Sequence, residues 1–424
     1  MRLLRLAFFV VVLQFPAGLS PAFAAQVETL DWGQCLVEAS GHHPDLRSAA
    51  EKVRQSEAQH DIVKGGLLPT VSATAGGQRS GSSTTPASGA WSYGFNMSQL
   101  LFDGAKTSSQ VNSAKETVKA SKFNESGVSV STRYALRTAF VQLLTAQKQV
   151  SLAEEIMTKR RQNLRLIALL YKSGIEHIGS LSKAQADLAE AEYEVSQAKR
   201  GLELAQVVLG TQLGRFWPGA IRVTGQFTAS EETRRLPDFD RIVRDNPSYL
   251  SLAAQKDAAG YSLQAARSAF MPSVSLTAGF GNSALRQIPP DRTDWQTGVN
   301  LSVPIYAGGS GTAGVARSRA QVNQLSADEE SLYLSLIRNL AQNWKSFVDA
   351  SENVDVQKKY LAAASERARI ADAQYSAGLV SFNEWTIIED NLVSAKKSFL
   401  NAQSNLLTAE AAWVKAKGGT LETR

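Results

Sequence analysis

The sequence predicts a mainly α-helical protein with a small β part, arranged as two tandem repeats of the same elements. Three observations predict this class. Segments of the first half recur in the second at a constant offset, two very long stretches carry helical periodicity, and four short segments alternate between apolar and polar residues. Each repeat is therefore expected to hold a short helix, a two-stranded β-hairpin and a long antiparallel coiled-coil hairpin.

Residues 1–24 have the features of a secretory signal peptide. Arg2 and Arg5 give a positive start, an apolar run covers residues 6–15, and Ala22-Phe23-Ala24 provides small residues at a cleavage site. The chain is therefore predicted to be exported. The rest is expected to divide into a first repeat at 25–217, a connector at 218–240 and a second repeat at 241–424.

The duplication keeps nearly one register along both halves. LPTVSATAGG at 68–77 corresponds to MPSVSLTAGF at 271–280, and Pro69 and Pro272 are 203 residues apart. WSYGFNMSQLLFDG, starting at Trp91, corresponds to WQTGVNLSVPIYAG, starting at Trp295, with an offset of 204. Self-similarity over this length indicates that one structural unit occurs twice.

Prolines, periodicity and glycines predict the helices. Pro44 and Pro247 suit the first position of the short helices. Apolar residues recur at helical spacing in the long segments, and Gly174 and Gly378 are placed to end them. The long helices are expected at 105–172 and 310–376, and the helices that pair with them at 180–214 and 382–416. Close packing is predicted from alanines at expected facing positions, namely Ala184, Ala186, Ala189, Ala191 and Ala198.

Four segments alternate with the period of two that is typical of β-strands. They lie at 71–75, 91–98, 274–280 and 295–305. Each strand would have one apolar and one small-polar face, and about ten residues is the span of a tilted transmembrane strand. Polar loops are expected between paired strands, at 81–89 and 282–294. The residues expected to face lipid are Val71, Ala73, Trp91, Tyr93, Phe95, Val274, Leu276, Phe280, Trp295, Val299 and Leu301.

A soluble antiparallel sheet with one face on a core is the alternative for these segments. The helices, however, are expected to pair with each other, and no apolar run after the signal is long enough for a transmembrane helix. Four strands cannot close a barrel, since small barrels need about eight. Strands must then be pooled between copies, and three copies would give twelve strands.

Neither the composition nor the short motifs indicate a catalytic, cofactor or nucleic-acid-binding site. No cluster of Lys and Arg suggests nucleic acid, and the single Cys35 is expected to be a small buried residue. Gly309, Gly311 and Gly314 fit a dinucleotide fingerprint, but the preceding segment alternates, so we interpret them as a strand-to-helix corner. We expect no catalytic residue, no cofactor and no metal. The histidines, expected to face solvent at helix ends, are His42, His43, His60 and His177.

This order of elements resembles the TolC family of outer-membrane efflux proteins. The resemblance rests on the two proline-started strands, the corners LFDGAK and IYAGGS, and the tips YKSG and YSAG, and it covers the mature chain. It implies a homotrimer with a trimeric 12-stranded barrel in the outer membrane, continuous with an α-helical tunnel in the periplasm. The implied partners are a periplasmic adaptor, an inner-membrane pump and outer-membrane lipid. The adaptor is expected to contact Gly174, Ile175, Gly378 and Leu379.

The resemblance also implies a gate. In the TolC family an acidic pair after the second tip forms the narrowest rings, and a tyrosine and an arginine bond to an aspartate in the first tip. The matching positions here hold Glu384 and Ile387 for the acids, Tyr375 for the tyrosine, Val380 for the arginine and Ser180 for the aspartate. Tyr375, Glu384 and Ile387 are thus the expected gate residues. Most of the polar latch would be missing, with closure relying on Phe382, Trp385 and Ile387. The alternative is that Glu384 is a solvated acid in the first turn of a helix.

Three functions remain open on the sequence. An outer-membrane duct of a tripartite efflux system is favoured, and the duct of a type I protein secretion system uses the same scaffold. A periplasmic coiled-coil adaptor is a different class, which normally has one helical hairpin rather than two. A soluble enzyme has no supporting site. The transported substrate and the matching pump cannot be read from the sequence.

Overall fold

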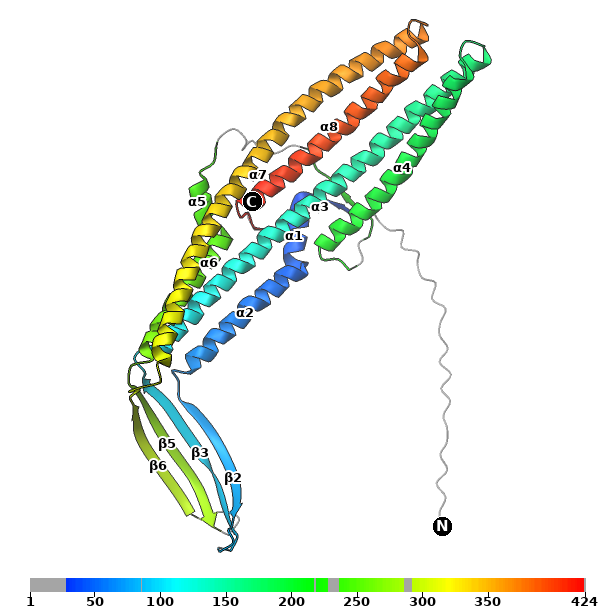
Figure 1. The fold of residues 1–424 in the computed structure, drawn as a ribbon. Coiled ribbons are helices and arrows are strands. Elements are labelled where there is room, and N and C mark those ends of the chain that lie inside the picture. Colours follow the sequence, from blue (N-terminus) through cyan, green and yellow to red (C-terminus); the bar gives the residue numbers. More distant parts are fainter. Residues whose placement is uncertain (1–27, 85, 217–218, 228–235, 286–291, 423–424) are drawn as a thin grey trace, which may run out of the picture.

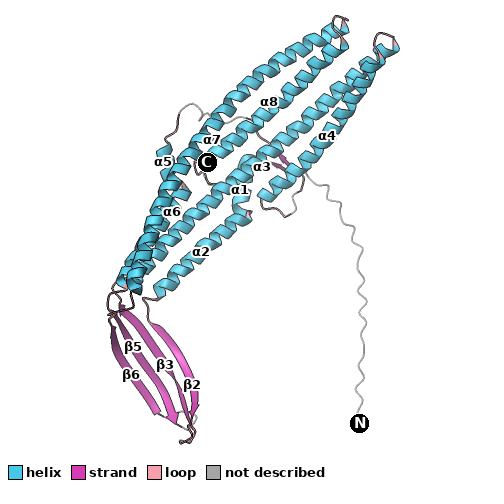
Figure 2. Cartoon of the chain, viewed as in Figure 1, coloured by secondary structure: helices cyan, strands magenta, loops and turns pink. Residues whose placement is uncertain are grey.

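The computed structural model describes residues 28–422 except 85, 217–218, 228–235 and 286–291, so the predicted signal peptide lies outside the described residues. The molecule is elongated. A four-stranded sheet forms one end, and two long helical hairpins run away from it to the opposite end (Figure 1). Strands and helices are thus segregated along the length of the chain (Figure 2).

The two repeats contain the same elements with matched lengths. The first consists of α2 (Pro44–Gly65), β2 (Thr70–Ser80), β3 (Ser88–Phe102), α3 (Lys106–Lys172) and α4 (Ile178–Gln212). The second consists of α6 (Pro247–Ser268), β5 (Ser273–Leu285), β6 (Arg292–Ser302), α7 (Ser310–Ser376) and α8 (Phe382–Ala416). Helices α3 and α7 have 67 residues each, and α4 and α8 have 35 each. The predicted fold class is confirmed.

The sheet joins the two repeats. Its order is β2-β3-β5-β6, and all neighbouring strands are antiparallel. Strand β5 extends to Leu285, and strand β6 begins at Arg292. The predicted loop at 282–294 is therefore too long. Strand β6 ends at Ser302 although the alternation continues to Ile305, because Pro304 has no N–H to donate to the ladder.

The corners between strands and helices require left-handed backbone. Gly104 and Ala105 have φ of 64° and 65°, and Gly308 and Gly309 have φ of 59° and 78°. Gly309 of the glycine triplet therefore lies in the corner between β6 and α7, as we interpreted it from the sequence. Glycine adopts these angles without the steric cost that other residues meet.

Each long helix packs against the helix that follows it, as predicted. Ala184 and Ala191 are buried and Ala198 is half-buried, at the seven-residue spacing of a coiled-coil seam. The prediction is wrong for Ala186 and Ala189, which are exposed. They fall between the seam positions and lie on another face of α4.

A middle region was missed in the sequence. It adds β1 (Glu28–Leu30), α1 (Trp32–His42) and β4 (Ile221–Val223), which pack against α3, and α5 (Phe239–Arg244), which packs against α7. Strand β1 pairs in parallel with β4 from the connector. Cys35 is fully buried there, as predicted, and burial raises the pKa of its thiol to about 12.

The histidine prediction is partly wrong. His43 is buried because its ring caps α2, where Nδ1 accepts a hydrogen bond from the Asp45 N–H at 3.3 Å. His60 lies inside α2 rather than at its end. None of the helices in the described ranges is both long and apolar enough to cross a membrane.

Candidate gate at the hairpin tips

The two hairpin tips have the same backbone geometry. Helix α3 ends before Gly174 and α7 before Gly378, and both glycines have a φ of 75°. The Ile175 N–H donates to the Leu170 carbonyl at 2.9 Å, and the Leu379 N–H donates to the Gln374 carbonyl at 2.8 Å. This pattern closes a helix C-terminus around a left-handed glycine. It leaves Ile175 and Leu379 projecting, with 72% and 73% of their surfaces exposed.

An aromatic cluster lies directly behind the second tip. Tyr375 stacks on Trp385 with ring centroids 4.5 Å apart, and Phe382 lies 6.4 Å from Tyr375. Ile167 from α3 and Ala184 from α4 belong to the same buried cluster. The two hairpins of one chain are therefore packed together near their tips.

A hydrogen bond connects the two tips. The Tyr375 hydroxyl donates to Glu176 Oε1 at 2.9 Å. Burial, followed by this hydrogen bond, raises the pKa of Tyr375 above its usual value. The expectation that the polar latch is mostly missing is therefore wrong in one respect, since a tyrosine–carboxylate link is present.

The link was missed because the acid occupies a different position in the first tip. The position that matches the family's aspartate is Ser180. Its side chain is buried, and its Oγ lies 3.4 Å from His177 Nε2 in the cap of α4. Glu176 lies in the turn before that cap, where Tyr375 reaches it. A search for any carboxylate in the first tip would have found it.

Charged groups further along the helices add to this contact. Asp372 accepts from Lys159 Nζ at 2.7 Å and from Trp385 Nε1 at 2.8 Å. Arg160 pairs with Asp390. These pairs connect α3 to α7 and α8 beside a cavity of about 640 Å³.

Glu389 is the unusual member of this group. Its residue surface is 3% exposed, Oε2 lies 3.9 Å from Lys159 Nζ, and Oε1 has no hydrogen-bond partner among the described residues. Burial raises the pKa of its carboxyl, although Lys159 opposes this shift. This residue could not be predicted from the sequence, because its burial depends on contact between two hairpins.

The expected gate residues differ in exposure: two face outward from α8, and the third is buried on α7. Glu384 and Ile387 are both exposed and lie three residues apart on α8, so their side chains share one side of the helix. Tyr375 is buried at 8% exposure and faces the protein interior. Of the residues expected to close the gate by packing, Trp385 is buried within the chain, Phe382 is half-buried and only Ile387 remains exposed.

The residues expected to face lipid share one face of the sheet. Ala73, Phe95, Phe280 and Trp295 stand opposite one another in a row across all four strands. The register places Val71, Trp91, Tyr93, Val274, Leu276, Val299 and Leu301 on that same face. The next row, Ser72, Asn96, Gly279 and Gln296, has small or polar residues on the opposite face.

Comparison with known proteins identifies the family. The outer membrane efflux protein model matches residues 35–215 and 240–419. The chain belongs to the outer membrane efflux protein family. The two matched stretches correspond to the two structural repeats, and the resemblance to TolC-family channels is confirmed.

Individual relatives of this outer membrane efflux protein agree with the assignment. Outer membrane efflux protein BepC of Brucella suis is 24% identical over 405 residues, which cover 93% of this chain and 83% of BepC. The fold matches a crystal structure of CusC with a TM-score of 0.82 at 20% identity, covering 91% of each chain. It also matches the open state of the Neisseria gonorrhoeae MtrE outer membrane channel, with a TM-score of 0.82 at 22% identity, covering 92% of this chain and 89% of that one.

Proposed function

We propose that this protein is the outer-membrane duct of a tripartite efflux system, working as a homotrimer without chemistry of its own. The observation that carries the proposal is the sheet. It has one continuous apolar face and, within the described chain, unpaired outer edges on β2 and β6. Backbone N–H and C=O groups cannot be left unpaired in lipid, so both edges need a partner strand.

Three copies satisfy this requirement. Edge β6 of one copy pairs with edge β2 of the next, and twelve strands close a barrel with the apolar face toward outer-membrane lipid. The small-polar face then lines the lumen. The long hairpins continue from the barrel into the periplasm, because the corners at Gly104 and Gly308 turn each strand directly into a long helix.

The tips are the proposed contact for a periplasmic adaptor. They lie at the end of the molecule farthest from the sheet (Figure 1), and Ile175 and Leu379 project there as exposed apolar residues. An adaptor joined at this end connects the duct to an inner-membrane pump. Exposed Glu384 and Ile387, on α8 just behind the tip, would form the narrow ring of the gate when three copies meet at the axis.

Cell fractionation with an unboiled gel tests the assembly. We expect the protein in the outer-membrane fraction as a trimer that resists detergent and dissociates on heating. A monomer in the soluble periplasmic fraction would contradict the duct. Deletion of the gene then distinguishes the two kinds of duct. Drug sensitivity of the deletion strain indicates efflux, and loss of a secreted protein indicates type I secretion.

A further inference from the structure

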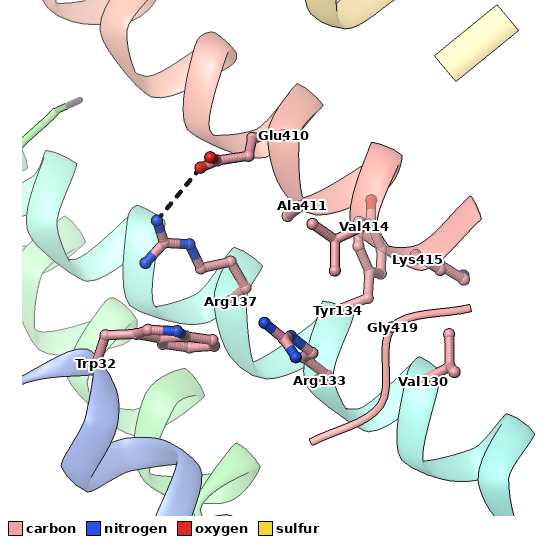
Figure 3. Close-up of a pocket in the computed structure, with 10 residues that line it drawn as sticks. All are labelled: Trp32, Val130, Arg133, Tyr134, Arg137, Glu410, Ala411, Val414, Lys415 and Gly419. Carbon is pink, nitrogen blue, oxygen red and sulfur yellow. Dashed lines mark ion pairs between the residues drawn. The ribbon is translucent and has the colours of Figure 1, made fainter. Parts of the chain in front are cut away.

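The two helical hairpins of the chain are in contact at two levels. Helix α3 of the first hairpin runs beside α8 of the second (Figure 1). In the middle region the Arg137 guanidinium on α3 lies 3.5 Å from the Glu410 carboxylate on α8, and 4.8 Å from the centroid of the Trp32 ring (Figure 3). The Thr145 hydroxyl on α3 also donates to Ser404 Oγ on α8 at 3.0 Å. At this level the two hairpins are therefore joined through polar groups that have partners.

Near the tips the contact between the hairpins contains a carboxyl without a hydrogen-bond partner. Glu389 on α8 is 3% exposed, and its Oε1 accepts no hydrogen bond from any described residue. Its Oε2 lies 3.9 Å from Lys159 Nζ on α3, which is longer than a hydrogen bond. A buried carboxylate is costly unless hydrogen bonds replace its lost hydration, whereas the neutral, protonated carboxyl is not.

The cations that face Glu389 are each bonded to a different acid. The pairs are Lys159 with Asp372, Arg160 with Asp390, and Lys396 with Glu155. Lys159 and Arg160 come from α3, Lys396 comes from α8, and Asp372 faces Glu389 from α7. Burial raises the pKa of Glu389 most strongly, Lys159 opposes this shift and Asp372 adds to it. The contact between the hairpins therefore favours the protonated form of Glu389.

Ionisation of Glu389 becomes easier when the hairpins part near the tips. A cavity of about 640 Å³ lies between α3, α7 and α8 at this level, and Glu389, Lys159 and Asp372 are among the residues that line it. Movement of α8 away from α3 would let water reach the carboxylate and remove the cost of burying its charge. By linkage, the protonated carboxyl then favours the contact, and the ionised carboxylate favours separation.

We propose that Glu389 is a proton-controlled switch between the two hairpins: when it is protonated the hairpins close against each other near the tips, and when it is ionised they separate there. The contacts of Arg137 and Thr145 in the middle region keep the hairpins joined during this movement. The sign follows from the raised pKa. Stabilisation of the closed contact is complete at low pH and is lost as the pH rises through the pKa of Glu389 in that contact. The separation is a property of the chain itself, and only its consequence, opening of the helical end of a duct, rests on the proposed function.

The distance between the two tips tests this switch. Spin labels are attached at Ile175→Cys and Leu379→Cys, which are exposed positions on the two tips. The native Cys35 is fully buried, and burial raises the pKa of its thiol to about 12, so it does not react with the label. Co-expression with an excess of unlabelled chain gives trimers that carry one labelled chain. Pulsed electron paramagnetic resonance of this protein in detergent should show the longer tip-to-tip distance gaining population as the pH is raised from acidic to mildly alkaline.

Variants at position 389 separate ionisation from packing. We expect Glu389→Gln and Glu389→Met to hold the shorter distance at every pH, because neither side chain can ionise. Glu389→Asp keeps a carboxyl and should restore the dependence on pH, which a purely structural role would not explain. Glu352→Gln, at an exposed acid on α7, is the matched control and should behave like the wild type.

Two results would overturn the switch. One is a tip-to-tip distance that does not change with pH in the wild type, and the other is a change that persists in Glu389→Gln and Glu389→Met. Conductance in planar bilayers gives the separate test of the duct, where we expect resting conductance to rise with pH in the wild type and to stay low in Glu389→Gln. A distance change controlled by Glu389 in a protein that forms no channel would support the switch and contradict the proposed function.

Discussion

At the scale of single residues, the buried carboxyl of Glu389 makes the tip region sensitive to pH. Its Oε1 has no partner in the described chain, and burial raises its pKa. A carboxyl with a raised pKa in the folded state adds stability at low pH, when it is protonated. That stability is lost as the pH rises through the folded pKa, because the buried carboxylate must then exist as an ion.

Glu389→Gln should therefore stabilise the protein at neutral pH. The amide cannot ionise, so we expect a gain of about 1 kcal/mol that shrinks as the pH falls below the pKa of Glu389. Lys159, Arg160 and Lys396 favour the charged form and limit the gain. Thermal melting across pH measures it, with Glu352→Gln, an exposed acid on α7, as control. A gain that does not depend on pH would contradict this explanation.

Glu384 is the residue on which the proposed gate can be tested directly. It is exposed on α8 beside Ile387, and three copies at the axis would concentrate negative charge that attracts cations. We expect Glu384→Ala to reduce cation selectivity in planar-bilayer recordings, and Glu352→Ala to leave it unchanged. If Glu384→Ala keeps both resting conductance and selectivity, Glu384 does not line the constriction.

At the scale of elements, the sequence predicted what depends on local pattern. Helices α7 and α8 begin and end at or within a residue of the expected positions, because Gly309, Gly378 and uninterrupted periodicity mark their ends. Strands β1 and β4 were missed, since each has three residues and exists only by pairing across almost the whole first repeat. The Tyr375–Glu176 bond was missed for a different reason, because its acid lies in the turn before α4 and not at Ser180, the position that the resemblance implied.

The two faces of the sheet should respond differently to charge. Phe95 lies in the apolar row and Asn96, the next residue on β3, in the polar row. We expect Phe95→Arg to block assembly, because an arginine facing mid-membrane lipid costs about 2–4 kcal/mol. Asn96→Arg should assemble and alter conductance instead. Trimer yield on unboiled gels measures both, and equal yields would exclude lipid contact by the Phe95 face.

At the scale of the whole molecule, the two ends serve opposite requirements. The sheet must be completed permanently, since its edges cannot remain unpaired in lipid. The helical end must be able to move apart if the duct is to open. The contacts between the hairpins near their tips suit this purpose, because several are polar and can be exchanged for contacts with water: Lys159 with Asp372, Arg160 with Asp390, and Tyr375 with Glu176.

The Tyr375–Glu176 bond is the contact whose loss should open the resting duct. Tyr375→Phe removes only the hydroxyl and keeps the stack on Trp385. A hydrogen bond to a charged group contributes about 1.5 kcal/mol, and three copies acting together would favour the closed arrangement by roughly a thousandfold. We therefore expect Tyr375→Phe and Glu176→Gln to raise the resting conductance of the trimer in planar bilayers. Tyr360→Phe, an exposed tyrosine on the same helix, should leave it unchanged. Wild-type conductance in both tip variants would mean that this bond does not hold the hairpins closed, and that packing behind the tips does so alone.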